Sequence, residues 1–202
     1  MIIQPGLCKI EGFVKIHDPN TGEILVDKKN AIHYENISLA MAQTLSNRNL
    51  GYIYEMAFGN GGSSVDPTGV ITYLPPNTIG QNADLYNQTY AKVVDDNSAA
   101  NTDPENNKMT PLHTGGNVYS DILVTCLLDY GEPPEQQAFD NSTNFNGEFV
   151  FDELGLKTWN GLPTDLRLIT HVIFHPVQKS LNRQIQIDYT LRIQTLSNIN
   201  AV

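Results

Sequence analysis

His171 and His175 have the spacing most suggestive of metal chemistry in this chain. Two histidines four residues apart chelate zinc when both lie on one turn of a helix. Their segment, residues 170–176 (THVIFHP), is β-branched and aromatic and ends in proline, which favours a strand. On a strand the two imidazoles share a face but stand about 13 Å apart. We therefore expect structural histidines, with a metal site only if a distant part of the chain supplies further ligands.

A glycine-rich run at residues 58–64 (FGNGGSS) has the composition of a phosphate-binding loop and follows an expected strand. A phosphate-binding loop of the P-loop type needs Gly-Lys-Ser/Thr opening a helix. Here residues 65–67 (VDP) follow, and the run contains no lysine. We predict a turn that leads into an arm.

Oxygen ligands alternate along a second segment, at Asp140, Ser142, Asn144 and Glu148. Such alternation is typical of calcium loops, but the glycine falls one place late, at Gly147, and the spacing of an EF-hand loop is not met. An adventitious cation is the alternative that this segment leaves open.

Acidic residues offer the remaining route to catalysis, because glycoside cleavage needs two carboxyl groups that face each other across a site. Neighbouring acids occur at Asp95–Asp96, at Asp152–Glu153, and at Asp129 with Glu132. In a chain with 22 acids we expect such pairs to be solvated surface. The sequence has no G-x-S-x-G nucleophile elbow, and neither Cys8 nor Cys126 lies in a pattern typical of a catalytic thiol. The prediction is a protein that is not an enzyme and has no catalytic, cofactor-binding or metal residues.

The composition of the chain restricts the kinds of partner that it is expected to bind. The 202 residues are 40% hydrophobic and 17% charged, which suits one folded domain over 1–202. The net charge of −10 disfavours duplex nucleic acid, since phosphate neutralisation needs a basic surface. No apolar run approaches the roughly 18 residues of a membrane span, and the N-terminus lacks a signal-peptide pattern. We expect no membrane partner and no export address, and we expect Cys8 and Cys126 to be buried thiols.

The elements that must position these residues are mostly strands. Ile187, Tyr189 and Leu191 belong to a strict alternation over residues 184–194, which predicts a long strand with these three side chains in the core. Residues 166–177 are apolar on both parities and predict a strand covered on both faces. Because a loop of hairpin length separates them, we expect these two strands to pair antiparallel.

The same patterns predict further strands at residues 9–17, 23–27, 51–58, 89–95, 121–130 and 147–153. Residues 18–22 (DPNTG) are turn formers and predict a hairpin between the first two. Residues 36–47 carry apolar side chains at helical spacing and predict one short amphipathic helix, which covers an open end or face of the sheets. The predicted fold is a mainly β, jelly-roll-like antiparallel β-sandwich with one helix and long ordered loops.

Two long polar stretches, 59–88 and 95–116, contain no expected element. Structureless connections of this length are uncommon in compact domains and act as binding loops or assembly arms. We interpret them as loop arms that contact neighbouring subunits, since a lone loop rarely repays its ordering entropy.

Five segments carry a family resemblance. Residues 29–40 (KNAIHYENISLA) and 53–62 (IYEMAFGNGG) resemble an arrangement in virion structural proteins of tailed bacteriophages, in which a strand and a turn feed a short helix and then a strand that closes on a Gly-x-Gly loop. Residues 151–157 (FDELGLK), 168–179 (LITHVIFHPVQK) and 186–193 (QIDYTLRI) look like the closing strands of structural proteins from myovirus-like and marine phages. The resemblance covers about half of the chain and brings no catalytic residues with it.

The resemblance implies a non-enzymatic structural component of the virion, in the neck, tail or baseplate, assembled in the host cytoplasm. Its partners would be other virion proteins and copies of itself in a ring or lattice, with a homo-oligomer as the working unit. Two alternatives remain open: a capsid decoration protein, and a β-sandwich carbohydrate-binding module that stacks sugars on exposed aromatic side chains. The aromatic candidates are Tyr73, Tyr86, Tyr119 and Trp159.

Overall fold

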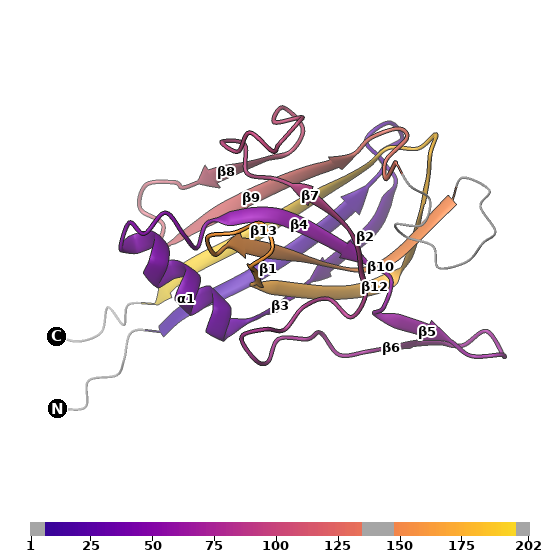
Figure 1. The fold of residues 1–202 in the computed structure, drawn as a ribbon, viewed down its shortest axis with the longest axis horizontal. Helices are drawn as coiled ribbons and strands as arrows, with labels where there is room; N and C mark the ends of the chain where they lie inside the picture. The colour runs from indigo at the N-terminus through magenta and orange to yellow at the C-terminus, as the bar shows by residue number, and fades with distance from the viewer. Residues whose placement is uncertain (1–6, 135–147, 197–202) are drawn as a thin grey trace.

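The computed structural model describes residues 7–134 and 148–196 (Figure 1). Two antiparallel sheets pack face to face, as the sequence predicts. The first sheet contains, in spatial order, β2 (Ile24–Lys29), β1 (Leu7–His17), β13 (Ile185–Leu196), β9 (Tyr119–Leu128) and β8 (Lys108–Leu112). The second contains β3 (Ala31–Ile32), β12 (Thr170–Ser180), β10 (Glu148–Trp159), β4 (Ile53–Gly59) and β7 (Gln88–Val93), with β11 (Leu166–Leu168) paired to β10.

The core between the sheets is supplied by alternating strand residues. Ile187 and Tyr189 are fully buried on β13 and Leu191 is nearly so, which confirms the expected parity of this strand. β13 lies in the middle of the first sheet, paired with β1 over eleven residues and with β9 on its other side. The predicted hairpin of β1 and β2 is also confirmed, and its turn is closed by Asp18, whose side chain accepts the Asn20 and Thr21 amides.

One strand pairing differs from the prediction. β12 and β13 do not form a hairpin, because β12 lies in the second sheet and β13 in the first. The short connection between them therefore crosses from one layer of the sandwich to the other. The segment expected as a single strand is interrupted at Ile169, which separates β11 from β12, and residues 170–174 are buried as expected for a strand covered on both faces.

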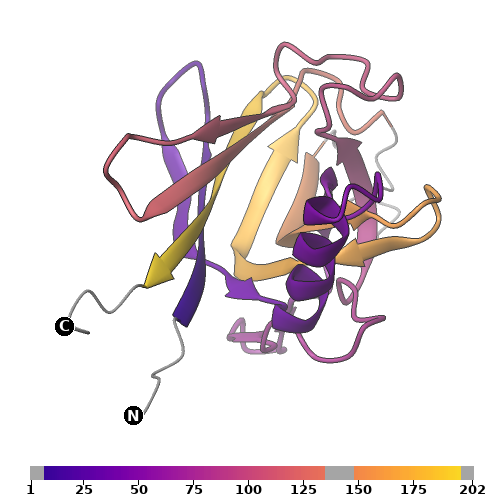
Figure 2. The same ribbon diagram turned by 90° about the vertical axis from the view of Figure 1, so that its left-hand side faces the viewer.

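The helix α1 (Tyr34–Leu45) begins two residues earlier than predicted. His33 caps it, since the His33 Nδ1 accepts the Asn36 amide at 3.2 Å. Ile37 and Ala40 enter the main core, so α1 covers the sheets at one end of the sandwich, the end that faces the viewer in Figure 2.

The two polar stretches have more structure than the sequence predicts. Residues 59–88 contain β5 (Ser63–Val65) and β6 (Ile71–Tyr73), which pair with each other, and residues 95–116 contain β8. The expectation that these stretches hold no element is wrong because their strands are short and mostly half-buried or exposed, so they lack the apolar alternation of core strands.

Candidate functional site

Glu153 on β10 and His171 on β12 form the most enzyme-like cluster of the described chain. Both side chains are fully buried, and the His171 Nε2 donates to the Glu153 Oε2 at 2.9 Å. The His171 Nδ1 accepts the Asn77 amide at 2.8 Å, so the proton directed at Glu153 lies on Nε2. The remaining lone pairs of Glu153 accept the backbone amides of Gly61, Tyr86 and Asn87.

Three backbone N–H groups converge on Glu153. Asn87 and Gly61 donate to Oε1 at 2.8 and 3.1 Å, and Tyr86 donates to Oε2 at 3.0 Å. Burial by itself raises the pKa of Glu153, but the hydrogen bonds from His171, Asn87 and Tyr86 outweigh burial and hold this pKa below its ordinary value. Glu153 is therefore an ionised carboxylate that bonds to backbone groups 66 to 92 residues earlier in the sequence.

Asp152 extends the cluster into the glycine-rich loop. Its Oδ1 accepts the Gly62 amide at 2.9 Å, and its Oδ2 accepts the Ser63 hydroxyl. Burial raises the pKa of Asp152 despite these bonds. The loop that resembles a phosphate cradle thus directs the Gly61 and Gly62 amides at the chain's own carboxylates. The sequence analysis predicted that Asp152 and Glu153 are solvated surface residues. This prediction is wrong, because the glycine-rich loop and His171 enclose both side chains.

The same region fastens the rest of residues 75–87 to the sandwich. The Asn36 Nδ2 donates to the Leu168 and Gln81 carbonyls at 2.9 and 3.2 Å, and the His33 Nε2 lies 2.9 Å from the Gly80 carbonyl. These contacts are made by buried side chains of the cap and first turn of α1. We call this set of side chains, His33, Asn36, Asp152, Glu153 and His171, the clamp. The clamp orders residues 75–87 of the 59–88 arm within a single subunit.

The two histidines that opened the sequence analysis have different surroundings. His171 is buried in the clamp, whereas His175 is exposed and its Nδ1 lies 3.1 Å from the Tyr73 hydroxyl of β6. Within residues 7–134 and 148–196, no three His, Cys, Asp or Glu side chains lie close enough to hold a metal ion together. Asp140, Ser142 and Asn144 of the calcium-like segment lie outside the described residues.

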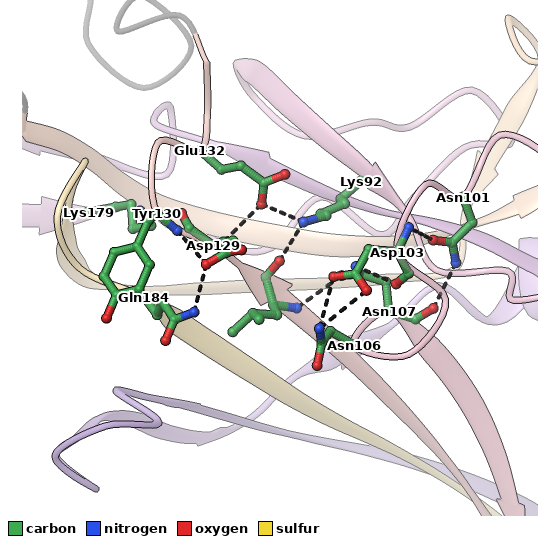
Figure 3. Close-up of polar contacts among 11 residues, drawn as sticks. Lys92, Asn101, Asp103, Asn106, Asn107, Asp129, Tyr130, Glu132, Lys179 and Gln184 are labelled. Atoms are coloured by element: carbon green, nitrogen blue, oxygen red, sulfur yellow. Dashed lines mark hydrogen bonds and ion pairs between the residues drawn. The ribbon is translucent and has the colours of Figure 1, made fainter.

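A second polar network joins β7, the end of β12 and the loop that follows β9 (Figure 3). The Lys92 ammonium donates to the Glu132 carboxylate and to the Leu127 carbonyl, and the Glu132 Oε2 accepts the Asp129 amide at 2.9 Å. Lys179 is fully buried and donates to the Asp129 and Ser180 carbonyls at 3.0 and 2.9 Å. Burial lowers the pKa of Lys179 to about 8, against the attraction of Glu132 and Asp129.

Asparagine accounts for much of the order in residues 95–107. The Asn107 Oδ1 accepts the Leu127 amide at 3.0 Å, and its Nδ2 donates to the Asp103 carbonyl at 2.9 Å (Figure 3). Asn101 bonds to the Asn107 carbonyl at 2.7 Å and accepts the Asp103 amide. Asn side chains that bond to nearby backbone groups form turns without neighbouring subunits. This segment is therefore built into the subunit rather than standing free of it.

The two cysteines differ in burial, and most of the aromatic candidates contact other side chains of the subunit. Cys126 is buried and burial raises the pKa of its thiol to about 12, whereas Cys8 is exposed, contrary to expectation. The Trp159 ring lies 4.8 Å from the Tyr54 ring, and an Arg192 guanidinium covers the Tyr119 ring at 4.1 Å. The Tyr86 ring lies 5.7 Å from the His171 ring, so three of the four aromatic candidates already have ring contacts within the subunit.

Two apolar features are exposed at the surface of the subunit. The β5–β6 hairpin projects from one end of the sandwich (Figure 1). Val65, Val70, Tyr73 and Leu74 on this hairpin are exposed. A groove of about 460 Å³ lies beside α1 and is bounded by residues of both sheets. Sequence analysis placed the hairpin inside a loop arm and missed the groove, because a groove between a helix and two sheets has no local sequence signal.

No helix in the described part of the chain is both long and apolar enough to cross a bilayer. No protein-family model, no curated protein and no solved structure gives a significant match to the chain.

Proposed function

We propose that the protein is a non-enzymatic structural component of a tailed-phage virion, in the neck, tail or baseplate, that acts through subunit contacts in a ring or lattice. The observation that carries the proposal is the β5–β6 hairpin, which presents apolar side chains to solvent. Val65 is 63% exposed and Val70 is 58% exposed. Exposed apolar protrusions mark protein-protein contact sites, because solvent exposure of such groups is unfavourable.

The cluster of Asp152, Glu153 and His171, whose residue types suggested catalysis, supports the same proposal. The carboxylates of Asp152 and Glu153 accept hydrogen bonds from the chain's own backbone and side chains, and His171 has a partner on each nitrogen. These groups fix loops and leave the hairpin on a rigid base. The resemblance to phage virion proteins supplies the kind of particle, with other virion proteins and copies of this chain as partners and the host cytoplasm as the place of assembly.

Sedimentation velocity over a range of protein concentrations, followed by electron microscopy of the concentrated sample, tests the proposal. We expect concentration-dependent species larger than a dimer, with rings, tubes or lattice fragments in the images. A glycan array on the same sample separates the carbohydrate-binding alternative. A protein that stays monomeric and binds a defined glycan would overturn the structural role in favour of that module.

A further inference from the structure

The dipeptide Asn-Gly follows two strands of the second sheet directly, at residues 160–161 after β10 and at residues 60–61 after β4. In this dipeptide the glycine nitrogen can attack the asparagine carboxamide carbon, because glycine has no side chain to obstruct the approach. A third copy, at residues 146–147, lies outside the described residues. The two described copies have the same chemistry, so their surroundings decide which of them reacts.

The Gly61 amide is already engaged. It donates to the Glu153 Oε1 at 3.1 Å, and Glu153 is held as an ionised carboxylate. The preceding carboxamide is held as well, since the Asn60 Oδ1 accepts the Asn87 Nδ2 at 2.6 Å. Hydrogen bonds to charged acceptors are among the stronger ones in proteins, and this bond must break before the Gly61 nitrogen can attack. The clamp therefore protects residues 60–61.

The Gly161 amide is in the opposite situation, because it has no hydrogen-bond partner among the described residues. Gly161 is exposed, and its φ of 108° belongs to the left-handed region that glycine adopts without strain. Apart from its chain neighbours, even an added methyl group at Gly161 would meet nothing closer than the Leu50 side chain, at 3.8 Å. The Gly161 nitrogen is therefore unobstructed and available for attack.

The Asn160 carboxamide is held at both ends by neighbouring side chains. The Gln43 Nε2 on α1 donates to the Asn160 Oδ1 at 3.3 Å, and the Asn160 Nδ2 donates to the Asp165 Oδ2 at 2.7 Å. Arg167 holds the other carboxylate oxygen of Asp165 at 3.1 Å. A donor at the amide oxygen stabilises negative charge that develops there, and a carboxylate beside the nitrogen stabilises positive charge as that nitrogen takes up a proton. These surroundings favour attack on the carboxamide carbon.

We propose that Asn160 is a site of self-modification, at which the Gly161 nitrogen attacks the Asn160 carboxamide carbon and the side chain loses ammonia. The bond from the Gly161 nitrogen to Cγ forms, the bond from Cγ to Nδ2 breaks, and the Gly161 amide proton leaves with Nδ2 as ammonia. Water then opens either C–N bond of the resulting succinimide, which yields aspartate or isoaspartate. Gln43 acts on the oxygen and Asp165 on the leaving nitrogen. Water is the only co-reactant, and the inference does not depend on the proposed function.

The modification changes the contacts of residues 160–165, which we call the β10–β11 bend. A carboxylate at position 160 stands beside the Asp165 Oδ2, where the unmodified side chain donates a hydrogen bond. An attraction between the two side chains thus becomes a repulsion between like charges. We expect the β10–β11 bend to loosen from α1, and its backbone amides to exchange faster after the modification than before it.

Peptide mapping of the folded protein over time tests the proposal. Trypsin cleaves after Lys157 and Arg167, so residues 158–167 form one peptide. This peptide should gain about 1 Da when the amide becomes an acid, and the isoaspartate form should appear as a second chromatographic peak of the same mass. The peptide of residues 49–92, which contains Asn60, provides the comparison in the same digest.

The two sites should differ in the folded protein only. We expect Asn160 to react at least about tenfold faster than Asn60, because attack on Asn60 first requires the loss of a hydrogen bond to a charged group. In urea neither site keeps its partners, so the two rates should converge.

Two substitutions test the side chains that hold the carboxamide. Gln43→Met removes the donor at the Asn160 oxygen, and Asp165→Ala removes the carboxylate at its nitrogen. Each should slow the reaction at Asn160 at least about threefold. Thr164→Ala is the matched control, because Thr164 is an exposed residue of the same bend. Asn60 reports on folding in every variant, since partial unfolding would speed its reaction.

Three outcomes would contradict this inference. Equal rates at Asn60 and Asn160 in the folded protein would overturn it, as would an Asn160 that reacts in urea but stays unmodified in the folded chain. If Gln43→Met and Asp165→Ala both react at the wild-type rate, the roles assigned to Gln43 and Asp165 are wrong. None of these results bears on subunit assembly, which the sedimentation experiment tests separately.

Discussion

Glu153→Gln tests whether the clamp orders the loop arm inside one subunit. The carboxamide keeps the oxygen that accepts the Gly61 and Asn87 amides, but places an NH₂ group where Oε2 accepts Tyr86 and His171. Two buried donors then lose their acceptor, at about 1–3 kcal/mol each. The opposite orientation of the amide strands the other pair of donors. We expect the substitution to destabilise the clamp by about 4 kcal/mol.

Native-state hydrogen exchange measures this effect where it occurs. If the clamp opens locally, the amides of Gly61, Tyr86 and Asn87 should exchange about a thousandfold faster in Glu153→Gln, since each 1.4 kcal/mol is a factor of ten. Glu105→Gln is the control, because Glu105 is an exposed acid in the other polar stretch. Less than a tenfold change at Tyr86 and Asn87 would refute the clamp and mean that other contacts order residues 75–87.

Further predictions concern pH, the core and assembly. The pKa of Glu153 in the folded protein lies below its ordinary value, so the stability that its ionised form contributes is present above the unfolded pKa and is lost as pH falls. Urea unfolding at pH 3–7, roughly the range in which a carboxylate titrates, should therefore show that the wild type loses stability more steeply toward acid pH than Glu153→Gln does. Lys179 has a folded pKa of about 8, below its unfolded value, so the unfolded chain binds more protons above that pH. From pH 7 to pH 9.5 the wild type should therefore gain about 2 kcal/mol relative to Lys179→Met, and parallel stability curves for the two proteins would contradict the buried ammonium. Ile187→Asp should lower the free energy of unfolding by about 4 kcal/mol because it buries an unpaired carboxylate, whereas Gln186→Asp, one residue earlier on the opposite face of the same strand, should cost less than about 1 kcal/mol; equal melting temperatures would show that the buried parity of β13 is wrong. In hydrogen exchange, the amides of residues 63–74 should exchange more slowly in the assembly than in the isolated subunit, while residues 77–87 should be equally protected in both states; equal exchange of 63–74 in both states would remove the hairpin from the contact.

Local chemistry made part of the fold predictable. The alternation around Tyr189 determines which face of β13 is buried, because successive side chains of a strand point to opposite faces. The turn at residues 18–22 joins two strands through the Asp18 Oδ1, which accepts the amides of its own neighbours, so its residue types predict it locally. The helix was predictable in kind and misplaced by two residues, since its cap is His33 rather than a residue with strong cap preference.

The pairing of β12 and β13 was decided only by the tertiary structure. Alternation shows that one face of a strand is buried but not which strand lies beside it, and a short loop can join neighbours in one sheet or strands of two facing sheets. The clamp has the same origin. Asp152 and Glu153 read as surface acids in the sequence, because the amides that make their burial favourable come from residues 61–63 and 86–87. The alternation, the turns and the acidic charge of the chain follow from its residues alone. Only the folded chain decided which buried charges found donors, and which apolar side chains of the hairpin were left in solvent, because both depend on segments brought together from distant positions.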